Sequence, residues 1–315
     1  MIDVVRDSVT RLRDRLATTD QRSRKSRFGI LLFAPALVLL MSLFLIPIAY
    51  IFYLSLHDIG ILEASGEFVG IGNYVELFTD AAFQHALWVG TVYAVGSVAF
   101  QLLLGLALAL LANKSFRGVS VVRTLVIFPY LVPMIAVVIM WRWIANPVYG
   151  VLNYALTSTG LVSESINFFG SLELVMPALI VASSWKYTAF VSLILLARLQ
   201  AIDETLYEQA KISGASTWQM FREVTLPNLK NAILLVVFLR SIFMFNKYSS
   251  IWLFTEGGPL SATTNLPIYL YERTFHQFEL GMGSAAAMTL FGILICFAIV
   301  YFTLFNPSEE IETTS

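Results

Sequence analysis

The sequence has few charged residues and only one cysteine. Asp, Glu, Lys and Arg make up 13% of its 315 residues, about half the share of a typical soluble domain, whereas 57% of the residues are hydrophobic. Together with a mean hydropathy of +0.75, this composition excludes an ordinary soluble globular protein. Cys296 lies inside an apolar stretch, so we exclude a disulfide framework or a cysteine-based metal site and expect a packing role. The net charge of −1 indicates no nucleic-acid partner.

Motifs for catalysis and cofactor binding are absent as well. The chain has no G-x-x-x-x-G-K-[ST] run, so nothing predicts a phosphate-binding loop. Its three histidines, His57, His85 and His276, do not have the spacing of metal ligands, and no Ser or Cys stands in a recognisable nucleophile motif. The sequence therefore predicts no catalytic residue, no metal site and no cofactor in this chain, and we expect that it is not an enzyme.

Six stretches are apolar and long enough to cross a ~30 Å hydrocarbon layer, which takes about 20 helical residues. The first is too long for a secretory signal peptide and lacks its cleavage site. The fourth contains Lys186, and the fifth contains Arg240 and Lys247. We therefore predict an all-α, polytopic membrane protein with a six-helix body, 28–305, between tails 1–27 and 306–315. The predicted spans are 28–56, 86–112, 124–144, 174–197, 231–254 and 280–305.

Basic residues are unequally distributed between the two sides of these predicted spans. Fifteen of the twenty Lys and Arg residues fall in the tail 1–27 and in the loops after the second and fourth spans. The loops on the opposite side contain only Arg273. Because Lys and Arg concentrate on the cytoplasmic side of membrane proteins, we expect both termini and the loop at about 198–230 to be cytoplasmic.

Acidic residues are missing from the predicted spans, since every Asp and Glu lies in a loop, in a tail or at a membrane edge such as Glu173. Proton-coupled carriers usually keep buried acids as proton relays. Their absence favours an energy source outside this chain, such as a separate ATPase. A sodium-coupled carrier remains an alternative, because unwound helices can bind cations through backbone carbonyls.

The loop after the fourth span has the most distinctive pattern. Residues 207–227 predict a short helix, a corner at Gly214, and a second short helix that stops at Pro227. Glycine suits such a corner because it adopts a positive φ without strain. This pattern alone fits an ordinary cytosolic helical hairpin equally well.

The same run resembles the E-A-A…G…LP loop of binding-protein-dependent ABC importer permeases. Gln209 departs from that pattern, where the family usually has a second alanine, and so does Ser213, where many members have aspartate. The resemblance implies that this loop is the coupling helix that docks on the ATPase subunit. The matching residues are Glu208, Ala210, Gly214, Ala215, Phe221, Leu226 and Pro227.

A second stretch, 252–259, reads W-L-F-T-E-G-G-P and looks like the LTxGGP segment of permeases in the maltose-type sugar-uptake branch. This resemblance implies a sugar-importing permease subunit in the plasma (inner) membrane. It also implies its partners: a second homologous permease, two cytosolic ATPases that bind ATP and Mg, and an extracytoplasmic binding protein. Alternatives are a stand-alone secondary carrier, a membrane-anchoring scaffold, or a permease for glycerol phosphate or another polyol.

Charged side chains in two spans mark a candidate substrate path. Lys186, Arg240 and Lys247 would each cost about 2.5–3.5 kcal/mol if they faced lipid, so we expect them to face the bundle interior, a water-filled path or an interface. Helical spacing groups neighbouring aromatic and hydrogen-bonding residues with them on one stripe of each helix, as a sugar site requires. Helix packing or contact with the second permease subunit would explain the same stripes. The candidate residues are Ser183, Lys186, Tyr187 and Phe190 in the fourth span, and Phe243, Asn246, Lys247 and Ser250 in the fifth.

In related sugar permeases the corresponding helices line the transport cavity. The family commonly has acidic residues where Lys247 and Ser249 stand, so its usual substrate contacts are not carried over to this sequence.

Overall fold

The structure, a computed structural model, describes residues 33–305. The two predicted tails, 1–27 and 306–315, lie outside these residues, as does the start of the first predicted span. The chain divides into two compact units, Met1–Leu54 and Ser55–Ser315. The described part of the first unit is a helix, Phe33–Ser55, that is long and apolar enough to cross a membrane.

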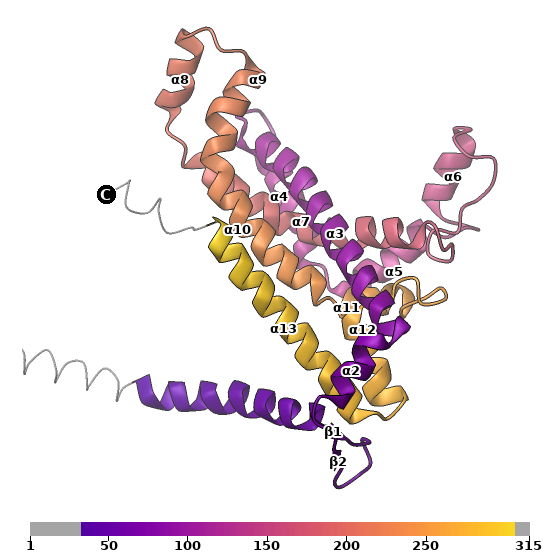
Figure 1. Cartoon of the computed structure of the whole chain (residues 1–315). Helices are drawn as coiled ribbons and strands as arrows, with labels where there is room; N and C mark the ends of the chain where they lie inside the picture. Colours follow the sequence, from indigo (N-terminus) through magenta and orange to yellow (C-terminus); the bar gives the residue numbers. More distant parts are fainter. Residues whose placement is uncertain (1–32, 306–315) are drawn as a thin grey trace, which may run out of the picture. The chain divides into compact units, whose positions relative to one another are not determined.

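The second unit is mainly helical and also has one pair of two-residue antiparallel strands (Figure 1). Its elements in chain order are β1 (His57–Asp58), β2 (Glu67–Phe68), α2 (Gly72–Thr79), α3 (Ala81–Asn113), α4 (Val119–Leu131), α5 (Met134–Ile144), α6 (Val151–Ser158), α7 (Val175–Gln200), α8 (Glu204–Ile212), α9 (Thr217–Met220), the π-helical turn η1 (Phe221–Thr225), α10 (Leu226–Phe245), α11 (Ser249–Thr255), α12 (Leu266–Tyr271), the π-helical turn η2 (Glu272–His276) and α13 (Leu280–Phe305).

Membrane-spanning length is reached by five helices in the described part of the chain. A sixth span results if α4 and α5, which meet at a bend of 104°, are counted as one. The prediction of an all-α polytopic protein with six spans is therefore confirmed. The five helices are Phe33–Ser55, Ala81–Asn113, Val175–Gln200, Thr217–Phe245 and Leu280–Phe305.

The third predicted span is not one continuous helix, because a proline interrupts it. A residue that precedes proline is pushed out of the α conformation, and Val132, before Pro133, has an extended backbone with φ −71° and ψ 130°. Helix α5 then begins directly after Pro133. The backbone carbonyls around this break lack helical partners, which matters for the site described below.

The fifth predicted span is also shifted along the chain. It ends at Phe245 rather than at 254, and it begins at Thr217 instead of 231, because Pro227 does not stop the helix. The preceding turn η1 is wider than an α-helix, and the N–H of Leu226 donates to Phe221 O, five residues back. Pro227 then sits in the first turn of α10, where a missing N–H costs little.

Helices α3 and α7 pack closely along much of their length (Figure 1). A Cβ atom on Gly105 would lie 2.6 Å from Val191 Cγ1, so glycine is required for this approach. Small residues at helix contacts are typical of membrane proteins, in which close backbone approach provides the packing energy. Helix α10 completes this part of the core through Leu229 and Val236.

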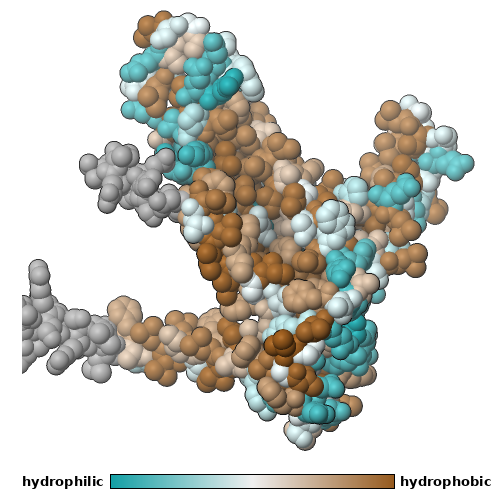
Figure 2. Space-filling model, viewed as in Figure 1, coloured by the Kyte–Doolittle hydropathy of each residue, from teal (hydrophilic) through white to brown (hydrophobic). Residues whose placement is uncertain are grey.

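Hydrophobic residues cover the outer surface of the long helices, as Figure 2 shows for one face. On that face hydrophilic residues gather around α8 and α9 and, at the opposite ends of the long helices, around α2 and the β1–β2 pair. Large side chains such as Leu103, Leu235 and Ile299 are more than half exposed. Such an extended apolar surface is unusual for a soluble monomer and fits contact with lipid.

Candidate functional site

The loop between α7 and α10 is built by local capping chemistry. The carboxylate of Asp203 accepts from the N–H of Thr205 at 2.9 Å and starts α8. Gly214 has φ +79°, a left-handed conformation that ends the helix at the predicted corner. Ser216 and Gln219 then form a capping box that starts α9.

The loop is also tied together by side chains. The hydroxyls of Tyr207 in α8 and Thr225 in η1 share a hydrogen bond of 3.0 Å. The rings of Trp218 and Phe221 stack with centroids 5.5 Å apart. Because α9 continues through η1 into α10 as one helix, the loop is joined directly to a membrane span.

The predicted coupling residues lie on both sides of this loop. Glu208, Gly214, Leu226 and Pro227 are exposed, whereas Ala210, Ala215 and Phe221 are half-buried. The inner side of the loop borders a pocket of about 770 Å³ that also reaches the ends of α3 and α7. The pocket is lined by Leu110, Asn113, Lys114, Leu199, Glu204, Tyr207, Lys211, Thr217, Trp218, Met220, Phe221 and Thr225.

Two of the predicted path residues lie in a buried hydroxyl cluster. Tyr93 Oη lies 2.9 Å from Ser183 Oγ and 3.3 Å from Ser250 Oγ. All three side chains are fully buried. In this conformation Ser183 and Ser250 therefore join α3, α7 and α11, and they do not line an open path as the stripes predicted.

Arg240 occupies the centre of a second, larger cluster. Only 5% of this residue is exposed, and its Nε donates to Gln101 Oε1 at 2.7 Å. Gln101 Nε2 in turn donates to Ser184 Oγ at 3.1 Å. Arg240 stands out in the sequence as a charge within a predicted span, whereas Gln101 was not predicted; its only signal is a lone amide in an apolar span.

Aromatic rings surround the Arg240 guanidinium. Its Cζ lies 4.8 Å from the ring centroid of Tyr187, 5.8 Å from that of Phe190 and 6.0 Å from that of Phe243. Lys247 Nζ lies 4.3 Å from the same Tyr187 ring. Such cation–π contacts favour a positive charge next to an aromatic face.

Lys186 is held by the break between α4 and α5. Its Nζ donates to Tyr130 O at 2.7 Å and to Val132 O, with a longer contact of 3.5 Å to Pro129 O. These carbonyls belong to the end of α4, where the helix dipole also favours a cation. The expectation that Lys186 avoids lipid is consistent with this position.

The structure thus brings together most of the predicted path residues. Lys186, Tyr187 and Phe190 of α7 lie near Phe243 of α10 and near Lys247, which follows it. Phe243 is 55% exposed and the neighbouring Asn246 is exposed, so the cluster reaches the surface of this chain. We call Lys186, Tyr187, Phe190, Arg240, Phe243 and Lys247 the cationic–aromatic cluster.

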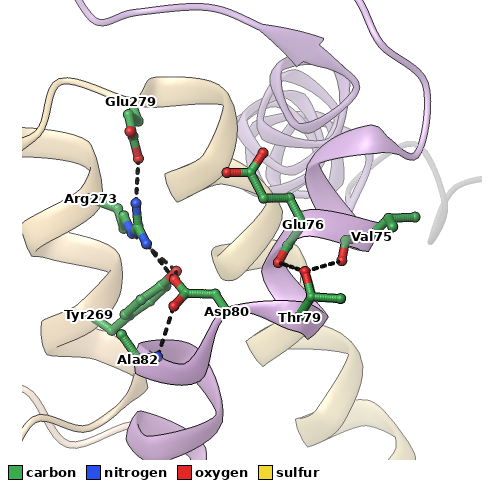
Figure 3. A network of polar contacts seen from close by, with 8 residues as sticks. All are labelled: Val75, Glu76, Thr79, Asp80, Ala82, Tyr269, Arg273 and Glu279. Atoms are coloured by element: carbon green, nitrogen blue, oxygen red, sulfur yellow. Dashed lines mark hydrogen bonds and ion pairs between the residues drawn. The ribbon is translucent and has the colours of Figure 1, made fainter.

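A further polar network lies at the ends of the long helices opposite to α8 and α9 (Figure 3). Asp80 starts α3 by accepting from the N–H of Ala82 at 2.8 Å and also accepts from Tyr269 Oη at 2.6 Å. Arg273 forms an ion pair with Asp80 and another with Glu279, at 2.9 Å. We call these side chains the outer network.

Burial alone would raise the pKa of Asp80, but hydrogen bonds from Tyr269, Ala82 and Arg273 outweigh it. The net result is a pKa below the ordinary value of the carboxyl group.

Comparison with known proteins decides the family. The profile of the family described as "Binding-protein-dependent transport system inner membrane component" matches residues 101–307, which is more than half of the chain. The chain belongs to this family. The matched range contains the α8–η1 loop and the whole cationic–aromatic cluster, so the resemblance seen in the sequence is confirmed.

Two relatives match the permease over nearly its whole length. The trehalose/maltose transport system permease protein MalF of Thermococcus litoralis is 32% identical over 91% of this chain and 97% of its own. The sulfoquinovosyl glycerol transport system permease protein SmoG of Agrobacterium fabrum is 32% identical over 89% and 91%. Both are permease subunits, which disfavours a stand-alone carrier or a scaffold.

A solved structure has the same fold. It is a bacterial ABC transporter involved in the import of the acidic polysaccharide alginate, and it matches with a TM-score of 0.76 and 22% identity. The match covers 89% of this chain and 96% of the other. The permease is thus a multi-pass membrane protein with the helical fold of an ABC importer subunit.

Proposed function

We propose that this permease imports a sugar together with a second, homologous permease subunit. Two cytosolic ATPases would bind ATP and Mg, and an extracytoplasmic binding protein would deliver the sugar. One relative is named for the transport of trehalose and maltose, and the other for the transport of sulfoquinovosyl glycerol. Each of these solutes contains a sugar, which supports this substrate class. The bias of basic residues supports a cytoplasmic position for both termini and for the α8–η1 loop.

The observation that carries this proposal is the construction of the α8–η1 loop. Its outer side exposes Glu208 and Gly214, whereas its inner side is tied by the Tyr207–Thr225 hydrogen bond. A partner that pushed on α9 would therefore move a connected body rather than a loose segment. Since α9, η1 and α10 form one helix, the motion would reach Arg240 and Phe243 without a hinge.

The cationic–aromatic cluster is the proposed substrate path. Exposed Phe243 and half-buried Tyr187 offer ring faces on which a sugar can stack, and Asn246 offers an amide for its hydroxyls. The buried Ser183 and Ser250 would contribute only if α7 and α11 separated during the transport cycle. Helix α10 links this path to the loop on which the ATPase acts.

The test is ATP-dependent sugar uptake by proteoliposomes that contain the complete transporter. Gly214→Asp should reduce uptake at least about tenfold, because a negative charge then faces the docking surface. Gly214→Asn is the matched control, since Asn and Asp both tolerate a positive φ and a Cβ there meets no neighbour within 4 Å. It should retain most of the uptake.

Two results would contradict the proposal. One is sugar accumulation by the permease alone under a proton or sodium gradient. The other is ATPase stimulation in the Gly214→Asp complex that equals that of the wild type.

A further inference from the structure

Three cations lie in one region of the helical bundle: Arg240 and Lys247 over the ring of Tyr187, and Lys186 over the ring of Tyr130. Lys186 is the residue before Tyr187 in α7. Along α10, the cluster lies at the end away from the α8–η1 loop. Arg240 donates to Gln101, and Gln101 lies in the middle third of α3.

Within residues 33–305, no carboxylate compensates these charges. The sequence has no Asp or Glu in 81–163, 174–202, 224–255 or 280–308. Among the residues that the structure describes, none of the three cations forms an ion pair. An uncompensated cation at membrane depth is costly, so a permanent excess of positive charge there requires a function or a partner.

The three cations differ in how far their hydrogen-bonding capacity is used. Lys186 donates to backbone carbonyls, and Arg240 donates through Nε to Gln101 while its Nη2 has only Met244 Sδ at 3.5 Å. The Lys247 ammonium forms no hydrogen bond with any described residue and lies over the Tyr187 ring. Lys247 is therefore the cation most available to a ligand, and Arg240 lies behind it against the same ring.

Lysine and arginine can only donate hydrogen bonds. A solute held here must therefore supply acceptors, and an anionic group adds Coulomb attraction to the hydrogen bonds that it accepts from Lys or Arg. The exposed ring of Phe243 and the half-buried ring of Tyr187 add apolar faces next to these donors. The site thus combines surfaces for a sugar ring with donors for an anionic group.

We propose that the transported solute is a carbohydrate that bears an anionic group, such as a carboxylate, a sulfonate or a phosphate. Lys247 contacts this group directly, Arg240 adds its charge from behind Tyr187, and Phe243 stacks on the sugar. This inference rests on the proposed function, because it requires that the cluster faces the transport path. The competing occupant is an acidic side chain of the second permease subunit.

The first test identifies the solute. The binding protein is purified from its native cells together with its bound sugar, and the sugar is released and analysed by mass spectrometry. We expect a uronate, a sulfonated sugar or a sugar phosphate, which must also be taken up by the complete transporter in an ATP-dependent manner. If the sugar released from the binding protein is neutral and the complete transporter takes it up in an ATP-dependent manner, the proposal is overturned. The importer function would still stand.

The second test uses the complete transporter in proteoliposomes, with the identified sugar and a neutral counterpart in which the anionic group has been reduced or removed. Lys247→Gln should lower the preference for the anionic sugar over the neutral counterpart, measured as the ratio of their kcat/KM values, about tenfold, mainly through a higher KM for the anionic sugar. Lys247→Arg keeps the charge and should restore most of the affinity.

Purification of the Lys247→Gln complex distinguishes the two possible occupants of the site, which are the anionic solute and an acidic side chain of the second permease subunit. Retention of the second permease at wild-type stoichiometry, with the selective change in KM, supports the anionic solute. Loss of that subunit, or an equal change for both sugars, would show that Lys247 serves assembly or packing and would overturn the proposal. A complete absence of ATP-dependent uptake in the wild type would instead refute the importer function itself.

Discussion

Arg273 in the outer network and Arg240 in the cationic–aromatic cluster are both largely removed from solvent, but their partners differ. The Arg273 side chain is 21% exposed and forms ion pairs with Asp80 and Glu279. Arg240 is 5% exposed and has an amide, a thioether and three aromatic rings around it. Arg273 is thus paired with two carboxylates, whereas Arg240 has no carboxylate partner among residues 33–305.

This difference indicates different roles. The outer network joins the start of α3 to η2 and to the residue before α13, so its charges hold together two regions that are far apart in the chain (Figure 3). A charge that is already paired has little left to offer a ligand. The charges of the cationic–aromatic cluster form no ion pair with any residue in 33–305, so they are available to a solute or a partner.

The largest effect on transport is expected from removing the positive charge of Arg240. The double variant Arg240→Met with Gln101→Leu is made in a Ser184→Ala background, because Gln101 Nε2 donates to the buried Ser184 Oγ. It should lower uptake at least about tenfold and leave the melting temperature of the purified complex near that of the wild type. Apolar side chains of similar size can replace buried charged or polar groups without loss of stability when no polar partner is orphaned. Uptake and thermal unfolding, measured on the same preparation, check this.

Arg240→Met alone is the control, because it leaves Gln101 Oε1 without its donor. It should be less stable than the double variant, by about 1–3 kcal/mol. If the double variant and Arg240→Met have the same melting temperature, the cationic–aromatic cluster is a structural network like the outer network.

A loss of stability similar to that of Arg240→Met is expected from breaking the outer network. Arg273→Met leaves Asp80 and Glu279 without their cation and should destabilise the permease by about 1–3 kcal/mol. Uptake per folded complex should stay within about twofold of wild type, because Arg273 lies away from the proposed path. Arg273→Lys keeps the charge but loses the forked geometry and should give an intermediate melting temperature.

A smaller effect is expected from acidification. The pKa of Asp80 is lowered in the folded protein, so ionised Asp80 stabilises the fold above its ordinary pKa of 3.8. This contribution is lost as the pH falls from that value through the lower folded pKa. The gap in melting temperature between wild type and Asp80→Asn should therefore stay constant from neutral pH down to about pH 4 and narrow below it.

Asp80→Asn keeps the cap on α3, since its amide oxygen can still accept from Ala82. A gap that already narrows between pH 7 and pH 5 would contradict a lowered pKa for Asp80.

Sequence patterns predicted the local structure of the α8–η1 loop where it depends on neighbouring residues. Asp203, Gly214 and Ser216 act on backbone groups two or three residues away, so the two helices and their corner follow from local chemistry. The predicted stop at Pro227 was wrong, because η1 accommodates the proline inside a continuing helix.

The substrate path was predicted only in part. Helical spacing places Ser183 and Tyr187 on one face of α7, but it does not tell which neighbour covers that face. Tyr93, ninety residues earlier in the chain, buries Ser183. Gln101 escaped notice for the same reason, since its role depends on Arg240 in a distant helix.

The sequence by itself determined that this protein crosses the membrane several times, because the length and apolarity of each span decide insertion one segment at a time. It also determined the family, through the fixed offsets within residues 207–227. Only the tertiary structure decided which charged side chains in 33–305 form ion pairs and which do not. Asp80 and Arg273 are far apart in the chain, and their pairing depends on how α3, η2 and α13 pack. Arg240 and Lys247 converge on Tyr187, and the carbonyls of the α4–α5 break hold Lys186, because this break and the end of α10 both meet α7, a geometry that no local pattern encodes.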